Sequence, residues 1–466
     1  MSRTRRKTPF LTRFEGRGAF LTLAALLVVV FLTGGGSRGD ITSLVLLRPF
    51  AILCLACGLF WISPDHWRAY RLPLALMGAL IALLALHLVP LPPVVWSSLP
   101  GREIAVSASA LVDAESVWRP LAMVPYRAWN AFYAMLVPAA ALVLAVQLRE
   151  DQQQRILYLI MALIALSAIL GIAQAVSGHN SALFFYRVTN PGSAVGLFAN
   201  KNHQAAALCM LLPMLALAGS RAKGTARTTG RFASAGAALL VFTLILATGS
   251  RAGVVFAILA LAGSWLVISG RPQMIAARTH KKARVVPLAL AAAALVACAS
   301  LAIIFSRASA LDRIVASDTV EEGRFEVWRV TAEFLPYYQP FGAGFGSFVE
   351  VFQIHEPNSM LATKYWNHAH NDWLEWLLEG GVPVALLLIA ALFGFVRAFM
   401  RLRSRLHGGQ FAVQLGMAGA VALIILFLWS LVDYPLRTPA LACLAAVATA
   451  WMAAPGKDAG WRKAGR

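Results

Sequence analysis

Apolar segments of roughly 20 residues follow one another along most of this 466-residue chain, with polar connections between them. A helix of that length crosses the ~30 Å hydrocarbon layer of a bilayer, and a composition of 59% hydrophobic and 13% charged residues does not suit a water-soluble surface. We therefore predict an all-α integral membrane protein with about 12 transmembrane helices. The expected spans are residues 18–34, 41–62, 72–90, 128–148, 155–176, 203–219, 232–248, 252–269, 285–305, 382–400, 412–432 and 437–454.

No linker rich in proline or serine divides the chain, so we expect residues 1–466 to form a single polytopic membrane domain. The apolar stretch at residues 19–33 follows a basic tail, as in a signal peptide. It lacks a small-x-small cleavage site and is interpreted as a retained first span. All five cysteines lie in apolar segments, where we expect neither a disulfide framework nor a zinc site, and the CxxC spacing of Cys54 and Cys57 is interpreted as coincidence.

The formal charge of +20 falls in short basic runs between the apolar segments. Such a charge would suggest nucleic acid in a soluble protein, but this pattern is the positive-inside signal, and no nucleic-acid partner is expected. With these spans, about 27 basic and about 5 acidic residues share the face that holds both termini, against about 14 and about 16 on the other face. We therefore expect the N- and C-termini in the cytoplasm.

Three long connections then lie outside, at residues 91–127, 177–202 and 306–381. The third, between the ninth and tenth spans, is the longest and is expected to carry short amphipathic helices. Its segment Arg324–Leu335 predicts a helix on the membrane surface or capping the bundle, because apolar residues recur in it at helical spacing. That expected apolar face consists of Phe325, Trp328, Ala332 and Leu335.

The motif TGSRAG at Thr248–Gly253 interrupts an apolar run that is too long for one transmembrane helix. The chain must fold back there, which holds Arg251 near the membrane boundary, with Ser250 as the expected N-cap of the following helix. A guanidinium beside a helix N-terminus suits a phosphate anion. The alternative is that Arg251 only extends toward lipid headgroups.

The motif HAHNDWLEWLLEGG at His368–Gly381 combines two histidines with an expected helix start. Asp372 and Glu375 have capping-box spacing, so a short helix is predicted to begin there and to stop at Gly380 and Gly381. His370 would precede its N-terminus, which disfavours the imidazolium and suits a general base. A pair of surface histidines and a metal site using His355, His368 and His370 are the alternatives, and the predicted site contains no metal.

Two further motifs have a weaker interpretation. In GLFANKNH at Gly196–His203, Asn200, Lys201 and Asn202 lie at an expected outer helix start, where they either bind sugar hydroxyls or phosphate or act as ordinary caps. The glycines of FGAGFG at Phe341–Gly346 are interpreted as a flexible turn, because no strand context supports a dinucleotide site.

Together these motifs resemble the O-antigen ligase and polymerase family of membrane glycan transferases. The resemblance covers a core at residues 192–397 and rests on GLFANKNHQAA, TGSRAG, GRFEVW at Gly323–Trp328 with the following PFGAGFGSF, and HAHNDWLEWLLEGG. The stretch LVPLPPVVWSSLPGRE at Leu88–Glu103 also resembles members of this family.

The resemblance implies a metal-independent, inverting glycosyltransferase of the bacterial inner membrane, with a periplasmic active site and no cofactor. Its donor would be an undecaprenyl-diphosphate-linked glycan, and its acceptor the lipid A core or a growing glycan. By the same resemblance Arg251 and Arg324 would bind the diphosphate, and His370 would assist the acceptor hydroxyl as base. His368, Asn371 and the residues of the helix start would support them, and Arg187 and Lys201 would add positive potential for the anionic donor.

Two other classes compete with this hypothesis. A transporter or flippase for lipid-linked glycans would carry ionisable residues within its spans and show repeats between its halves. Acidic residues are almost absent from the predicted spans, apart from Asp433 near one end, and no internal repeat is visible. A structural scaffold would leave Arg251 and His370 without a purpose.

Overall fold

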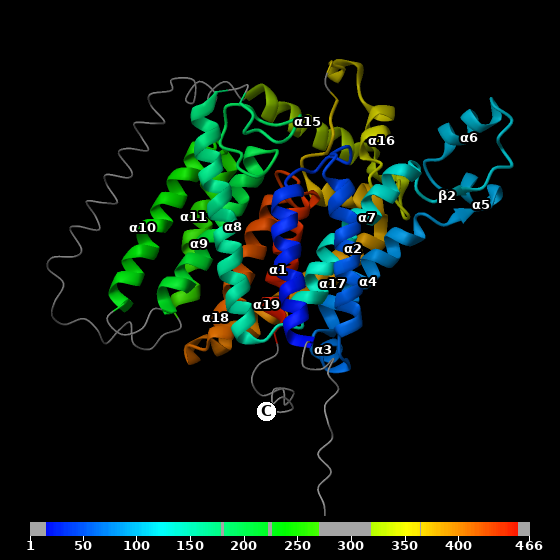
Figure 1. The fold of residues 1–466 in the computed structure, drawn as a ribbon. Coiled ribbons are helices and arrows are strands. Elements are labelled where there is room, and N and C mark those ends of the chain that lie inside the picture. Colours follow the sequence, from blue (N-terminus) through cyan, green and yellow to red (C-terminus); the bar gives the residue numbers. More distant parts are fainter. Residues whose placement is uncertain (1–14, 179–180, 222–225, 270–317, 364, 455–466) are drawn as a thin grey trace, which may run out of the picture.

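The computed structural model describes residues 15–178, 181–221, 226–269, 318–363 and 365–454, and their regular structure is almost entirely helical (Figure 1). The long or strongly apolar helices are α1 (Glu15–Thr33), α2 (Leu44–Trp61), α4 (Arg71–Leu86), α7 (Pro125–Ala145), α8 (Glu150–Ser177), α9 (Lys201–Arg221), α10 (Ala226–Ala247), α11 (Arg251–Ser269), α17 (Asp372–Arg405), α18 (Phe411–Trp429) and α19 (Pro439–Ala453). The shorter elements are α3 (Pro64–Ala69), α5 (Pro93–Ser97), α6 (Glu103–Ala110), α15 (Asp318–Phe334), α16 (Phe348–His355), the 3-10 helices η2 (Leu335–Tyr338), η3 (Asn358–Met360), η4 (Leu406–Gly408) and η5 (Pro435–Arg437), and the strands β1 (Pro90–Leu91) and β2 (Arg119–Pro120).

Within these residues, 9 helices are long and apolar enough to cross a membrane, and α4 and α19 are shorter apolar helices. Each coincides with one of the predicted spans, so the prediction of an all-α membrane protein is confirmed. The ninth predicted span, residues 285–305, lies outside the described residues. The total of about 12 spans therefore stays a prediction.

The centre of the bundle is formed by α9 and α18, the most buried of the nine candidate spans. Helix α9 packs against α10, α11 and α18, while α19 packs against α18 and α7. Small residues allow this close packing: a Cβ atom on Gly419 of α18 would lie 2.7 Å from the Ala448 carbonyl oxygen of α19. The core therefore depends on the close approach of neighbouring helix backbones as well as on large apolar side chains.

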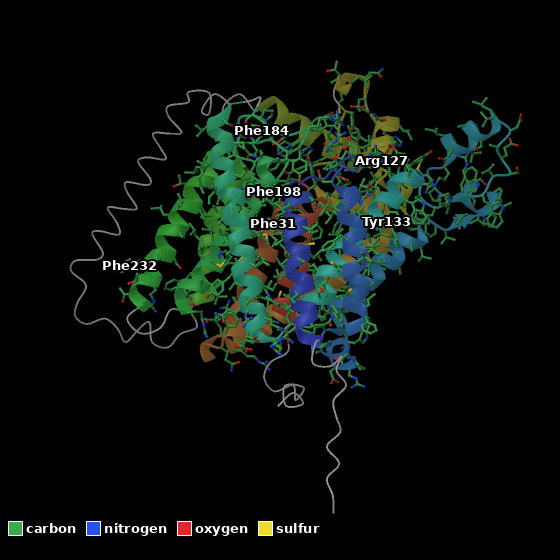
Figure 2. The ribbon with its side chains drawn as sticks, viewed as in Figure 1. Phe31, Arg127, Tyr133, Phe184, Phe198 and Phe232 are labelled. Atoms are coloured by element: carbon green, nitrogen blue, oxygen red, sulfur yellow. The ribbon has the colours of Figure 1, made fainter. Side chains whose placement is uncertain are left out.

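The two ends of the bundle differ. Helices α15 and α16 lie across one end, which we call the α15 end, and α3 lies at the opposite end (Figure 1). Arg127, Phe184 and Phe198 lie toward the α15 end, whereas Phe232 lies near the far end of α10 (Figure 2). Because Arg231 adjoins Phe232 in the first part of α10, this basic residue lies toward the end opposite α15. The positive-inside rule then predicts that the α15 end faces outward.

Helix α15 exists, but two details of its prediction were wrong. It begins at Asp318, before Arg324, and it ends at Phe334. Its buried face consists of Val327, Val330, Thr331 and Phe334, whereas Phe325 is 61% exposed and Ala332 is also exposed. Two adjacent faces of this helix carry apolar residues at helical spacing, so the sequence pattern allows either face to be buried. The contacts of α15 with α16 and η2 determine which of the two faces is buried.

The start of α17 also differs from its prediction. Asn371, not Asp372, is the N-cap, since its Oδ1 accepts a hydrogen bond from the Leu374 N–H at 3.1 Å. The predicted stop at Gly380 and Gly381 is confirmed, since the backbone leaves helical geometry at Gly381, with φ 60° and ψ −153°, and a second helical segment follows this kink to Arg405. Asp372 and Glu375 turn inward and are buried, which leaves them available for ion pairs.

The segment FGAGFG forms a fixed turn, in contrast to the flexible turn expected. The N–H groups of Ala343 and Gly344 donate to the carbonyls of Leu378 and Glu379, both at 2.9 Å.

Residues 88–122 form a lobe that extends sideways from the bundle (Figure 1). The lobe includes a short antiparallel ladder of β1 and β2, two strands that the sequence did not predict. Buried Arg102 fastens this lobe through hydrogen bonds to the Leu121 and Gly342 carbonyls.

Candidate functional site

The loop at residues 366–371 is held rigidly at the α15 end. Trp328 Nε1 of α15 donates to the Ala369 carbonyl at 2.8 Å, and the Ala369 N–H donates to Glu375 Oε2 of α17 at 2.8 Å. The peptide N–H of Asp372 donates to the Ser430 carbonyl at 2.8 Å. Three elements, α15, α17 and the end of α18, thus determine where His370 lies.

His370 lies in a strained backbone conformation and has a carboxylate partner. Its φ is 52°, a left-handed value that non-glycine residues seldom adopt and that requires support from surrounding contacts. Its Nδ1 lies 3.2 Å from Asp433 Oδ1, and its side chain is 13% exposed. An Nδ1–H donated to this carboxylate leaves Nε2 free to accept a proton.

The surroundings keep this imidazole neutral and its partner ionised. Burial lowers the pKa of His370 below 6.5, against the opposing effect of its hydrogen bond to Asp433. Burial would raise the pKa of Asp433, but the hydrogen bond and charge of His370, together with Arg324, outweigh it and hold that pKa below its usual range. The pair therefore has the state that a general base needs at neutral pH.

The Asp433 carboxylate also connects His370 to the start of α9. Asn202 Nδ2 donates to Asp433 Oδ2 at 2.7 Å. The neighbouring Lys201 Nζ donates to the Gly249 carbonyl at 3.2 Å, which joins the same helix start to the turn between α10 and α11. The GLFANKNH and TGSRAG motifs therefore meet, although they lie far apart in the sequence.

The turn between α10 and α11 has the predicted local structure. Ser250 Oγ accepts a hydrogen bond from the Gly253 N–H at 3.1 Å, so the predicted N-cap is confirmed. Arg251 is half-buried and is the first residue of α11, where the positive helix end adds to its charge. Lys201, Arg251 and the helix terminus form a positively charged corner.

Arg324 approaches the same site from α15. Its charge acts on His370, Asp433 and Tyr434, which places it among them. Its Nε atom is buried and has no hydrogen-bond partner within the described parts of the chain. A buried guanidinium donor without a protein acceptor suits an anionic ligand.

The other predicted site residues are distributed unevenly. His368 Nδ1 lies 2.8 Å from Glu375 Oε1, and the His368 and His370 rings lie 4.3 and 4.8 Å from the Tyr434 ring. Asn200 hydrogen-bonds the Tyr434 side chain. Asn371 serves as the cap of α17. Arg187 does not join the site: its side chain is 82% exposed and pairs with Asp40 at 3.3 Å.

The histidines of the metal-site alternative have other contacts. His355 Nε2 lies 2.8 Å from the Tyr338 hydroxyl, and its ring stacks on Phe334 at 4.4 Å. Across the described ranges, no group of three or more His, Cys, Asp or Glu side chains is placed to hold a metal ion. His368 and His370 each have a carboxylate partner, Glu375 and Asp433 respectively.

Sequence reasoning missed the connection between α18 and α19, which supplies Asp433, Tyr434 and Arg437. Arg437 lies within reach of three buried carboxylates on α17: Asp372 at 3.3 Å, Glu375 at 3.3 Å and Glu379 at 3.1 Å. The available signal was an acidic and a basic residue within five positions of each other, between two strongly apolar segments.

A cavity of about 1600 Å³ opens beside His368 and Arg437. It runs between α2, α4, α7, α17 and α19, and its walls are mostly apolar. Arg127 lies near its α15 end, and Arg68 and Arg401 line it as well. This cavity has the volume and chemistry for an apolar chain with a polar head.

Residues 236–389 match the family model described as O-antigen ligase. The match shows that about a third of the chain is similar to this family. The matched region contains Arg251, Arg324, His368 and His370, while Lys201, Asp433 and Arg437 lie outside it. No curated protein matches the chain.

Proposed function

We propose that this protein transfers a preassembled glycan from undecaprenyl diphosphate to an acceptor sugar at the periplasmic face of the bacterial inner membrane. The observation that carries the proposal is the convergence of four segments: the α9 start, α15 and the His370 loop meet around Asp433, and the α10–α11 turn is bonded to the α9 start. Three of these four segments lie within or overlap the O-antigen ligase match.

The cationic groups suit the leaving diphosphate. Arg251, Lys201 and Arg324 would neutralise the negative charge that gathers on the diphosphate as its bond to the sugar breaks. Arginine binds two phosphate oxygens at once, and the buried, unpartnered Nε of Arg324 is one such donor. These side chains supply the charge compensation without a metal ion.

His370 supplies the base. The acceptor hydroxyl attacks the anomeric carbon, its proton moves to His370 Nε2, and the bond to the diphosphate oxygen breaks. Asp433 holds Nδ1 and stabilises the imidazolium that forms. A single displacement of this kind inverts the anomeric configuration.

The cavity beside His368 supports a lipid-linked substrate. Its apolar walls can hold a polyprenyl or acyl chain while the polar head remains near His368 and Arg437. A ligase and a polymerase would both need such a chain, because each reaction begins with the same donor and differs in the acceptor.

The test is the surface polysaccharide of a deletion strain complemented with the wild-type protein or with Arg251→Ala, Arg324→Ala or His370→Ala. The wild type should restore transfer, and each variant should insert in the membrane without restoring it. A pool of long unattached chains in the deletion strain indicates a ligase, and short single repeats on the outer core indicate a polymerase. Normal transfer by all three variants would reject the proposed site.

A further inference from the structure

The buried ion cluster around Arg437 takes no part in the proton transfer proposed above. Asp372, Glu375 and Glu379 lie on one face of α17 with side chains that are 2%, 1% and 0% exposed, and the Arg437 guanidinium faces all three. Buried ion pairs contribute little to stability compared with apolar packing, and here one arginine faces three carboxyl groups, of which Glu375 also pairs with His368. Such a cluster needs a reason beyond stability.

We propose that Arg437 is a positioning residue that fixes the distance between His370 and Asp433. This inference rests on the proposed function, in which His370 is the base. The effect of Arg437 on the His370–Asp433 pair can be tested without any glycan. Arg437 is four residues after Asp433, and it holds α17 through Asp372, which is two residues after His370. Both partners of the catalytic pair therefore depend on the same ion cluster.

The surrounding hydrogen bonds make this connection rigid. The connection between α18 and α19 is fixed to the start of α17 at two points: Ser430 bonds Asp372, and Arg437 Nε donates to Asp372 Oδ1 at 3.3 Å. Asp433 lies between these points. On the other side, Glu375 contacts Arg437 and accepts from the Ala369 N–H, so the residue before His370 is fixed as well.

Lysine cannot replace this arginine. The Arg437 fork reaches Asp372 through Nε and Glu379 through Nη2, whereas a lysine ammonium is a single point of charge. Arg437→Lys should keep the cluster's charge but loosen the link between α17 and Asp433. His370 would then lose part of the carboxylate that favours its protonated form, and its pKa would fall.

Other charged groups around His370 do not explain such a change. Arg324 from α15, His368 from the same loop and His203 from α9 also act on the pair. None of them contacts Arg437 directly in the hydrogen bonds and ion pairs of the described residues. His368 shares Glu375 Oε1 with Arg437, so Asp433→Asn is needed to show the part of the shift that comes from the Asp433 carboxylate itself.

The experiment measures the pKa of His370 in the purified full-length protein from the pH dependence of its modification by diethyl pyrocarbonate, read by peptide mass spectrometry. Asp433→Asn removes the carboxylate and gives the largest expected effect, a fall in the His370 pKa of about one unit or more. Arg437→Lys should shift the pKa in the same direction, while His355 should titrate as in the wild type. The matched control is Arg329→Lys, at an exposed arginine that pairs with Glu326 and Glu333.

An unchanged His370 pKa in Arg437→Lys, with a lowered one in Asp433→Asn, would overturn the proposal. So would an unchanged pKa in Asp433→Asn. Should Arg437→Lys not fold, Glu379→Gln weakens the same cluster with less disturbance, and it must lower the pKa in the same direction. A wild-type protein that transfers no glycan would reject the proposed function and leave this measurement intact.

Discussion

The imidazole of His370 accepts a proton only while it is neutral, so its lowered pKa determines the pH range of transfer. Because that pKa lies below 6.5, the rate should be constant above neutral pH and should fall as the pH drops through it. Asp433→Asn should move this fall to lower pH and reduce the plateau by about 10-fold or more, since a weaker base remains. Initial rates of transfer between pH 4.5 and 8.5 check both effects, and a fall on the alkaline side would contradict them.

The two arginines should affect the donor. Arg251→Ala and Arg324→Ala should each lower kcat/KM for the lipid-linked donor by about 100-fold or more, because each substitution removes a positive charge that stabilises the leaving diphosphate. Lysine at either position should recover part of the loss, since it restores charge but not the planar fork. Rates with purified variants at limiting donor concentration are the measurement.

Arg187 provides a contrasting prediction. The sequence placed it with the donor site, but the structure places it at the surface beside Asp40. Arg187→Ala should therefore change kcat/KM by less than about 2-fold, because an exposed charge is screened. A loss as large as that of Arg251→Ala would show that the donor extends further than the site described here.

The sequence predicted the residues that carry chemistry within motifs, including Arg251, Arg324 and His370, because their types and local positions were unusual. It could not predict their partners. Asp433 is separated from His370 by two candidate transmembrane helices, α17 and α18, and no local pattern in the sequence links the two. The same reason hid Arg437.

At the scale of elements, local signals were reliable where one hydrogen bond decides the structure. The Ser250 cap fixed the start of α11. The orientation of α15 was wrong because tertiary contacts decide between two apolar stripes. The Gly380–Gly381 signal predicted a break correctly, but packing allowed the helix to resume beyond the kink.

The kink at Gly381 gives the clearest element-scale prediction. A Cβ atom there would lie 2.2 Å from the Pro340 carbonyl oxygen, and the backbone has a positive φ of 60°. Gly381→Ala should therefore destabilise the protein by about 2 kcal/mol or more, through strain and displacement of the FGAGFG turn. Thermal unfolding in detergent measures this. Gly78→Ala, at a position with open space around it, is the matched control and should leave the melting temperature nearly unchanged.

For the whole molecule, the membrane class and the order of the helices followed from the sequence. The thickness of the hydrocarbon layer fixes the length of each apolar segment, and such segments can be recognised along the chain. Sidedness depends on charge counting and is open to direct test. In a variant without the native cysteines, Asp113→Cys in the lobe should react with an impermeant thiol reagent in cells with a permeabilised outer membrane. Arg403→Cys, near the end of α17, should react only after the inner membrane is opened. The reverse pattern would place the site in the cytoplasm.

We propose chemical transfer by a site built around His370 and two arginines. The most direct measurement uses purified protein in proteoliposomes with undecaprenyl-diphosphate-linked glycan and its acceptor, followed by analysis of the product linkage and the released lipid. We expect one undecaprenyl diphosphate released per glycan transferred, with an inverted anomeric carbon, and no transfer by His370→Ala. Movement of intact lipid-linked glycan across the membrane, with no cleavage and no dependence on acceptor, would contradict it.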